Sequence, residues 1–250
     1  MISLRDVSFS YGCLSALDHI SLQVEKGEHM ALIGPNASGK TTLAMVMNAL
    51  LTPDRGECLV EGIDTRDDPM FARRTVGMVF QDPESQTVAR RVWDDVAFGP
   101  MNLGLPDGEV EKRVRESLDH VGLGAFSRRE VSCLSGGQKQ LLAVAGILAM
   151  KPSYIVFDEP TALLDGPGCR MVNKAVAGLK KNGIGIITIT HDMEEALTAD
   201  RIVALDTGRI VADMPPASLF SDEALMARIG IKPPYTFNLA VPREVVRECR

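Results

Sequence analysis

A glycine-rich segment that directly follows a short apolar run has the composition of a phosphate-binding loop. It reads Gly34-Pro35-Asn36-Ala37-Ser38-Gly39-Lys40-Thr41, with Thr42 next in the chain. Glycines in the pattern G-x-x-x-x-G-K-[ST] let the backbone turn its N–H groups toward a phosphate, and the following helix adds its positive end. Lys40 would add a point charge, and the Thr41 hydroxyl would be a ligand for Mg²⁺. The segment therefore predicts a site for the β- and γ-phosphates of a nucleotide.

Two carboxylates follow a second apolar run, Tyr154-Ile155-Val156-Phe157. Asp158 and Glu159 are therefore expected at the carboxyl edge of a buried sheet, where ligands bind in folds of this kind. Asp158 would hold Mg²⁺, and Glu159 would orient or deprotonate the water that attacks the γ-phosphate. By itself the pair could equally be two solvated carboxylates at the start of a loop. Its combination with the phosphate loop favours nucleotide hydrolysis.

Gln81 and His191 also follow predicted strands. His191 could donate a hydrogen bond to the charge that develops on a phosphate, and the Gln81 amide could reach the metal or the attacking water. The other three histidines, His19, His29 and His120, have no such placement, and we interpret them as ordinary. The expected catalytic residues are thus Lys40, Gln81, Glu159 and His191, and the expected metal ligands are Thr41, Gln81 and Asp158.

A second helix N-terminus suited to phosphate begins at Leu134-Ser135-Gly136-Gly137-Gln138. Ser135 is a favourable N-cap, and the amides of Gly136 and Gly137 would bind an anion at the positive end of the helix. The chain is therefore expected to carry two half-sites for phosphate, with Gln138 in the second.

Short apolar runs rich in β-branched residues are the predicted strands that position these side chains. They cover 7–9, 30–33, 76–80, 154–157, 184–189 and 202–205. Helical patterns at 41–51 and 138–150 lie between them, and this alternation predicts an α/β fold with a mainly parallel, buried sheet and helices on both faces.

Two further segments differ in character from this alternating pattern. Val110, Val114, Leu118 and Val121 recur at helix spacing among charges, which indicates an amphipathic helix within a segment at about 82–133. We interpret that segment as an inserted helical subdomain. After Pro215 prolines are frequent and periodic runs are few, so we expect an appended tail with little regular structure.

The composition limits the class of protein. A chain of 250 residues with 45% hydrophobic content is long enough for one large domain or for a core with a small insert. The net charge of −6 argues against a large nucleic-acid surface. No apolar stretch reaches the ~20 residues of a membrane-spanning helix and no secretion signal begins the chain, so we expect a globular, cytoplasmic protein without direct membrane insertion. Five cysteines without a CxxC pair indicate free thiols.

The combination of motifs resembles the ABC ATPases. Gln138, the last residue of LSGGQ, lies twenty residues before Asp158 (138 to 158), which is typical of that family, and the resemblance extends to about residue 215. It implies a P-loop NTPase core that binds ATP and Mg²⁺, an antiparallel β part at the N-terminus, an ATPase domain over 1–215 and a C-terminal tail over 216–250. It also implies that Tyr11 stacks on adenine and that Asp165 ends the D-loop. Two such domains would dimerise head to tail, with each ATP between the phosphate loop of one and the LSGGQ of the other.

A narrower resemblance lies in the residues that follow the predicted strand 76–80. The segments are Val79-Phe80-Gln81-Asp82-Pro83-Glu84-Ser85-Gln86, Asp95-Val96-Ala97-Phe98-Gly99-Pro100 and Asn102-Leu103-Gly104-Leu105. They are similar to the ATPases of energy-coupling factor (ECF) importers, which serve cobalt, nickel and vitamins. The resemblance implies a transmembrane T subunit, whose coupling helix would contact the residues after Gln81, and a substrate-binding S subunit. The chain would then lie peripherally on the cytoplasmic face of the cell membrane, and its tail would be a possible dimer contact. The alternative is that these segments only pack on their own subdomain.

The sequence departs from the family pattern at a few positions. Leu141 replaces an arginine, Ala162 replaces a serine, and Gly166 and Cys169 interrupt the usual Asp-Pro-x-Gly-Arg. These changes spare the main catalytic positions, but they put communication across the dimer in doubt and would suit pairing with a different ATPase.

Three other functions are compatible with parts of the sequence. They are the ATPase of a binding-protein-dependent importer, an ABC ATPase without a transport role, and a nucleotide-binding switch without catalysis. The ECF-like segments argue against the first, the chain length against the second and Glu159 against the third. Neither the cargo nor the choice between homodimer and heterodimer follows from the residues.

Overall fold

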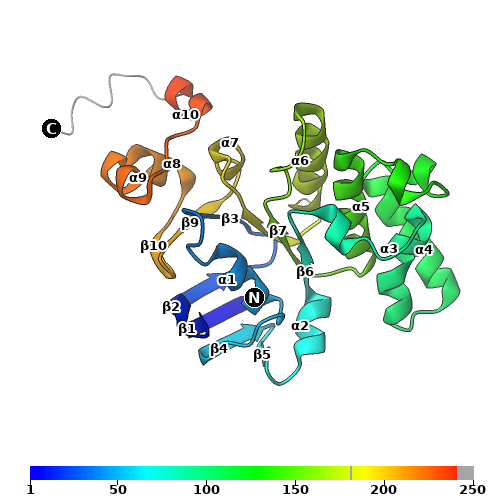
Figure 1. Cartoon of the computed structure of the whole chain (residues 1–250), viewed down its shortest axis with the longest axis horizontal. Coiled ribbons are helices and arrows are strands. Elements are labelled where there is room, and N and C mark those ends of the chain that lie inside the picture. Colours follow the sequence, from blue (N-terminus) through cyan, green and yellow to red (C-terminus); the bar gives the residue numbers. More distant parts are fainter. Residues whose placement is uncertain (181, 241–250) are drawn as a thin grey trace.

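The computed structural model describes residues 1–180 and 182–240, which form two sheets and a group of helices (Figure 1). The predicted tail extends beyond this range, so Cys249 and the rest of 241–250 lie outside the described residues. The other four cysteines, Cys13, Cys58, Cys133 and Cys169, are free thiols, as predicted. Within the described ranges, no helix has the length and apolar character needed to span a membrane.

The N-terminal sheet is antiparallel, as the family resemblance implies. Its strands are β1 (Ile2–Tyr11), β2 (Leu14–Val24), β4 (Arg55–Val60) and β5 (Ile63–Asp64), in the order β2-β1-β4-β5. β1 is longer than the predicted 7–9, and it also buries Ile2 and Leu4. Its pairing register with β2 shifts between Leu4 and Val7, which interrupts the regular alternation that reveals a strand in sequence.

The larger sheet contains the other predicted strands, and all its neighbouring pairs are parallel except β9 with β10. Its order is β10-β9-β3-β8-β7-β6, formed by β3 (His29–Ile33), β6 (Val76–Val79), β7 (Tyr154–Asp158), β8 (Gly185–Ile189), β9 (Arg201–Asp206) and β10 (Arg209–Met214). Every residue of β3, β6, β7 and β8 is buried, which explains why these strands are continuous apolar runs rather than alternating ones.

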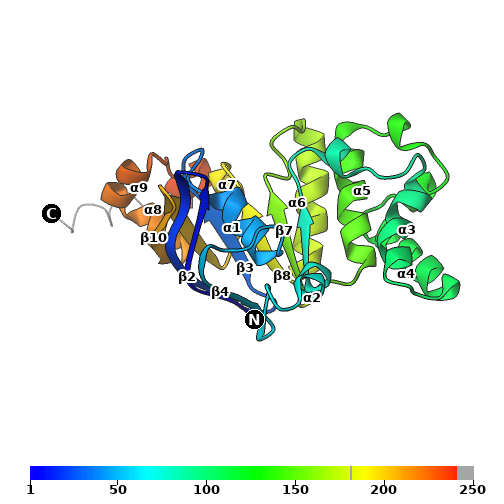
Figure 2. The same cartoon turned by 60° about the horizontal axis from the view of Figure 1, so that its bottom comes forward.

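Helices pack on both faces of this sheet, so the predicted α/β class is confirmed (Figure 2). Val156 of β7 packs in one core with α1 (Lys40–Met47) and the antiparallel sheet. Its neighbour Phe157 packs in a second core with α5 (Gly136–Ala149) and α6 (Gly166–Lys180). The shorter helices α2 (Pro69–Thr75) and α7 (Met193–Ala196) follow β5 and β8 in the chain.

A helical segment lies between β6 and α5. It contains the short 3₁₀ turns η1 (Pro83–Gln86), η2 (Gly124–Phe126) and η3 (Val131–Cys133), and the helices α3 (Val92–Asn102) and α4 (Asp107–His120). The predicted amphipathic helix is α4, whose Val110, Val114 and Leu118 are buried against α3 and α5. That the whole segment 82–133 forms a separate subdomain stays a prediction.

The prediction of little regular structure after Pro215 is wrong. In 216–240, the part of the tail that the structure describes, the chain forms three helices, α8 (Pro216–Ser221), α9 (Glu223–Ile229) and α10 (Tyr235–Ala240). The prolines begin α8 rather than break it, because Pro215 is its N-cap and Pro216 its first residue, where a missing N–H removes no helical hydrogen bond. Each helix is too short to show a period in sequence, and burial of residues such as Phe220 and Ile229 against β9 and α7 provides the stability that local propensity lacks.

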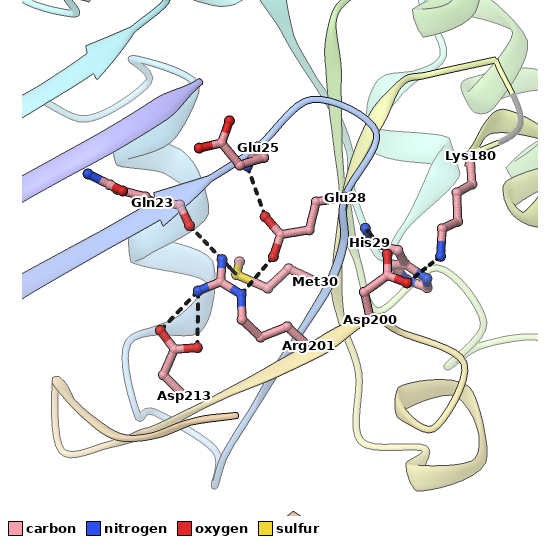
Figure 3. A network of polar contacts seen from close by, with 9 residues as sticks. All are labelled: Gln23, Glu25, Glu28, His29, Met30, Lys180, Asp200, Arg201 and Asp213. Carbon is pink, nitrogen blue, oxygen red and sulfur yellow. Dashed lines mark hydrogen bonds and ion pairs between the residues drawn. The ribbon is translucent and has the colours of Figure 1, made fainter. Parts of the chain in front are cut away.

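Arg201 joins the two sheets through a network of polar contacts (Figure 3). It pairs with Met30 at the start of β3, whereas the phosphate loop follows the end of this strand. Its Nε donates to Glu28 Oε1 at 2.6 Å, its Nη1 contacts both oxygens of Asp213 at 2.9–3.0 Å, and its Nη2 donates to the Gln23 carbonyl of the antiparallel sheet. One guanidinium of β9 therefore joins β2, β10 and Glu28, the residue directly before β3, which leads into the phosphate loop.

His29 lies beside this network and is only 7% exposed. Its backbone N–H donates to Asp200 Oδ2 at 3.0 Å, its Nε2 is 3.1 Å from Thr188 Oγ1, and Lys180 donates to Asp200 at 2.6 Å. Burial lowers the pKa of His29 below its ordinary 6.5; Lys180 lowers it further, and Asp200 opposes the change. The folded protein thus holds His29 neutral at pH values where an unfolded chain would protonate it.

We therefore expect the free energy of unfolding to fall as pH drops below about 6.5, because the unfolded chain then binds a proton that the folded chain rejects. The slope from this single group is at most about 1.4 kcal/mol per pH unit. Urea unfolding across this range should show a smaller pH dependence in His29→Gln than in the wild type. The matched variant His120→Gln, at an exposed position, should keep the wild-type slope. Equal slopes for His29→Gln and the wild type would rule out a buried neutral His29.

Candidate active site

The phosphate loop connects β3 to α1 and has a backbone that only glycine fits at two points. Gly34 and Gly39 have φ angles of 143° and 103°. A Cβ atom would lie 2.1 Å from the Leu205 carbonyl oxygen at Gly34 and 2.4 Å from the Ala16 carbonyl oxygen at Gly39. The loop is therefore packed tightly against β9 and β2, and side chains are excluded where the chain turns.

Lys40 begins α1 and folds back over its own loop. Its Nζ donates to the carbonyl oxygens of Gly34 and Pro35, both at 2.9 Å, and the residue is only 6% exposed. Burial lowers the pKa of Lys40, and the carboxylates of Glu159 and Asp158 oppose this change. Ser38 Oγ is buried and has no hydrogen-bond partner among the residues that the structure describes. An anion in the loop would find a lysine and a spare hydroxyl already in place.

Thr41 and Asp158 meet although they are far apart in sequence. The Thr41 hydroxyl donates to Asp158 Oδ2 at 2.9 Å, and Asp158 is 7% exposed at the end of β7. Burial raises the pKa of Asp158, Thr41 and Lys40 oppose this change, and Glu159 adds to it. In residues 1–180 and 182–240, no group of three or more histidine, cysteine or carboxylate side chains could hold a metal. A hydroxyl and one carboxylate suit Mg²⁺, which needs few protein ligands when phosphates supply the others.

Glu159 lies between Gln81 and His191. Its Oε1 is 3.1 Å from His191 Nε2, and its Oε2 accepts from Gln81 Nε2 at 3.4 Å. The backbone of Glu159 has φ of 50°, which is uncommon for a residue with a side chain, and its N–H donates to the Ile189 carbonyl at 2.9 Å. The carboxylate is 24% exposed, so it is fixed by neighbours yet accessible to water.

The fold explains why these residues meet. Gln81, Glu159 and His191 follow β6, β7 and β8, which are adjacent parallel strands, so all three lie at the carboxyl edge of the sheet. The phosphate loop follows β3, the neighbour of β8, at the same edge. The structure thus brings together the predicted catalytic residues and metal ligands. Their roles stay predictions.

The LSGGQ segment forms a capped helix N-terminus, as predicted. Ser135 Oγ accepts from the Gln138 N–H at 3.3 Å, and Gln138 Oε1 accepts from the Ser135 N–H at 3.0 Å, which is a complete capping box. A Cβ on Gly137 would lie 3.0 Å from Gly168 Cα, so α5 and α6 begin in backbone contact. Helix α5 stands beside α3, α4 and α6, whereas α1 lies between the two sheets (Figures 1 and 2).

The remaining predicted residues occupy different settings. Tyr11, at the end of β1, is 50% exposed and stands edge-on to Phe9 with ring centroids 4.9 Å apart, so a face is available for stacking. Leu141 is 1% exposed in the core around α5, where its apolar side chain suits the site. Cys169 Sγ lies 3.6 Å from the carbonyl oxygens of Thr161 and Leu164.

Gln140 and Gln86 are not among the site residues predicted from the sequence. Both contact the backbone of Phe80, next to Gln81. For Gln140 the sequence did contain a signal: it is a polar residue directly before the long apolar run that begins at Leu141, and an amide buried with such a run needs a specific partner.

The chain is similar to a family of known proteins over most of its length. The model of the ABC transporter family matches residues 17–162. The cobalt import ATP-binding protein CbiO of Syntrophus aciditrophicus is 47% identical over 94% of this chain and 85% of its own length. The energy-coupling factor transporter ATP-binding protein EcfA1 of Clostridium novyi is 46% identical over 96% of this chain and 89% of its own.

Two solved structures share the fold. CbiO1 from Clostridium perfringens, described as part of the ABC transporter complex cbiONQ, has a TM-score of 0.82 at 32% identity and covers 95% of this chain and 97% of its own. The ATP-binding cassette MJ0796, a dimer in a post-hydrolysis state bound to ADP and Pi, has a TM-score of 0.77 at 28% identity and covers 86% of this chain and 99% of its own. Because the family model spans more than half of the chain and the relatives span nearly all of it, the chain belongs to the ABC transporter ATPases, among the ATP-binding proteins of the energy-coupling factor type.

Proposed function

We propose that this ATPase energises an ECF-type importer for a metal ion such as cobalt or nickel, or for a vitamin. The observation that carries the proposal is the position of Glu159, between His191 and Gln81 and one residue from the buried pair of Asp158 and Thr41. A general base, a hydrogen-bond donor and a phosphate loop at one sheet edge are the parts that ATP hydrolysis requires.

In this proposal each residue has a separate task. Lys40 and the N–H groups of 34–42 bind the β- and γ-phosphates of ATP. Glu159 accepts a proton from the water that attacks the γ-phosphate, and Gln81 orients that water. His191 donates a hydrogen bond to the developing phosphate charge, for which its Nε2 must turn from Glu159 to the phosphate.

Mg²⁺ fits the donors at the loop. Thr41, Asp158 and Gln81 would hold it, because a hydroxyl, a carboxylate and an amide oxygen are the hard ligands that this cation prefers. When bound, the ion neutralises charge on the phosphates.

The second half-site requires a second ATPase chain. The capped helix N-terminus at Ser135, Gly136, Gly137 and Gln138 would bind the γ-phosphate of the ATP held by the partner, and Tyr11 would stack on the adenine of its own. ATP would then act as part of the dimer interface, and hydrolysis would release it. The dimeric state of MJ0796 supports this arrangement.

An apolar groove beside the Gln81 loop is the proposed contact for the membrane subunits. The groove has a volume of about 210 Å³. Most of its lining is apolar, with Asn48, Arg73 and Arg74 at the same groove; the apolar residues are Leu50, Gly77, Met78, Phe80, Ile147, Met150 and Pro152. Phe98 and Met101 of α3 are 49% and 64% exposed, and Gly99 between them lies against Met150. The coupling helix of a T subunit would find an apolar surface here, next to Phe80, Phe98 and Gly99, which belong to the segments that resemble ECF ATPases. This docking would place the chain peripherally on the cytoplasmic face of the membrane, with an S subunit supplying the cargo site.

Affinity purification from gently solubilised native membranes tests the proposal, with the co-purifying proteins identified by mass spectrometry. Recovery of a multi-helix T subunit and a small integral-membrane S subunit is the expected result, and the S subunit would indicate the cargo. Recovery of paired permeases with a soluble binding protein would contradict the ECF assignment. Recovery of no membrane protein would contradict a transport role.

A further inference from the structure

The backbone that carries Gln81 is held by two side chains rather than by a neighbouring strand. β6 is the last strand of its sheet, so within 1–180 and 182–240 no strand pairs with its outer side. There the Phe80 N–H donates to Gln86 Oε1 at 2.7 Å, and Gln86 Nε2 donates to the Met78 carbonyl at 3.0 Å. The Gln86 amide thus makes the two hydrogen bonds that a paired strand would make.

The carbonyl of Phe80 is held from a different element. Gln140 Nε2, on α5, donates to the Phe80 carbonyl oxygen at 3.2 Å. Gln140 is completely buried, and its Oε1 has no hydrogen-bond partner among the described residues. A buried amide with one satisfied group is a poor choice for packing alone, because Leu141 and Leu142 beside it show that the core accepts apolar side chains. The hydrogen bond to Phe80 is therefore the contact that an apolar side chain at position 140 could not make.

A surface contact strengthens the same junction. Lys139 of α5 forms an ion pair with Glu84 in the turn that follows Gln81. Helix α5 begins at Gly136, with Ser135 as its N-cap, so Gln140 lies in the second turn after the proposed binding site for the partner's ATP. The same helix therefore joins that N-terminus to the peptide before Gln81.

We propose that Gln86 and Gln140 are positioning residues for Gln81. They fix the N–H and the carbonyl of Phe80, and so they set the direction in which the next residue projects its amide toward Glu159, at 3.4 Å. The inference rests on the proposed function, because it gives the two glutamines a role in the hydrolysis step that Gln81 and Glu159 carry out. A misplacement of about 1 Å at a reacting centre can lower a rate about 100-fold.

Gln140→Met tests this role. Methionine has a similar length and no amide, so it removes the bond to Phe80 together with the unpaired Oε1. In the full chain, purified with the membrane subunits that accompany it, we expect kcat for ATP to fall about 10- to 100-fold while KM changes less than about twofold. Gln86→Met, at a half-buried position, should likewise lower kcat with little change in KM. It serves as the second variant if Gln140→Met does not fold. Gln23→Met, on the exposed side of β2, is the matched control and should leave both constants unchanged.

A double-mutant cycle separates positioning from a general structural effect. In a Gln81→Ala background, Gln140→Met should lower kcat no further, because the amide that it positions is gone. Additive losses, an unchanged kcat in both single variants, or a loss confined to KM would overturn the proposal. Normal turnover in Gln81→Ala would overturn it together with the role of Gln81 in the proposed function. If kcat falls in Gln81→Ala but in neither Gln86→Met nor Gln140→Met, the positioning role alone would be overturned.

Discussion

Replacement of Glu159 by glutamine is expected to lower the rate of ATP hydrolysis about 10²- to 10⁴-fold, which is the usual contribution of a general base. Glutamine keeps the size of the side chain but cannot accept the proton of the attacking water. The position of Glu159 explains why no neighbour replaces it: its two oxygens contact His191 and Gln81, and its N–H is held by Ile189. Asp158, the adjacent carboxylate, is buried and already accepts from Thr41.

ATP binding should persist in this variant, because the residues of the phosphate loop are untouched. A chain that binds ATP but does not cleave it should accumulate as a dimer, since ATP is proposed to hold the two chains together. Phosphate release, equilibrium ATP binding and light scattering on one preparation measure the three effects. Glu57→Gln is a suitable control, because Glu57 pairs with Arg5 on the surface of the antiparallel sheet. Turnover near the wild-type rate in Glu159→Gln would exclude Glu159 as the base.

Lys40→Ala is expected to weaken ATP binding about 10- to 100-fold. A hydrogen bond from a charged donor contributes about 1.5–3 kcal/mol, and about 1.4 kcal/mol corresponds to tenfold in affinity. Lys40 is buried beneath its own loop, where it donates to the carbonyl oxygens of Gly34 and Pro35. The Lys40→Ala substitution would therefore remove a phosphate ligand and also the two hydrogen bonds that stabilise the loop.

Isothermal titration calorimetry with ATP measures the change in the dissociation constant directly. Lys26→Ala is the matched control, because Lys26 is half exposed, pairs with Glu61 at 3.1 Å and precedes β3 at the end remote from the loop. Thermal unfolding of both variants shows whether the fold persists. An unchanged dissociation constant for ATP in Lys40→Ala would contradict the assignment of 34–42 as the nucleotide site.

Features that depend on neighbouring residues were predicted correctly from the sequence. The glycine-rich turn between β3 and α1, the N-cap at Ser135 and the carboxylates at the end of β7 each consist of contiguous residues, so their place in the fold could be predicted without knowledge of distant contacts. The parallel sheet followed from the apolar runs, because strands buried on both faces have continuous apolar sequences. Parallel neighbouring strands have their carboxyl ends at the same edge of a sheet. Because Lys40, Glu159, His191 and Gln81 each follow a predicted strand, their meeting at one edge could be expected from the sequence.

The tertiary structure decided the contacts between residues that are distant in the chain. Thr41 meets Asp158 across 117 residues, and Gln140 meets the Phe80 carbonyl across 60. No local pattern specifies such a pair, because an amide or hydroxyl can bond many partners and only packing selects one. The helices after Pro215 were missed for a related reason: each is too short for a period to show, and it is burial against β9 and α7 that stabilises them. The sequence by itself therefore determined the family and the chemical groups of the site, whereas packing determined which atoms hold those groups in position.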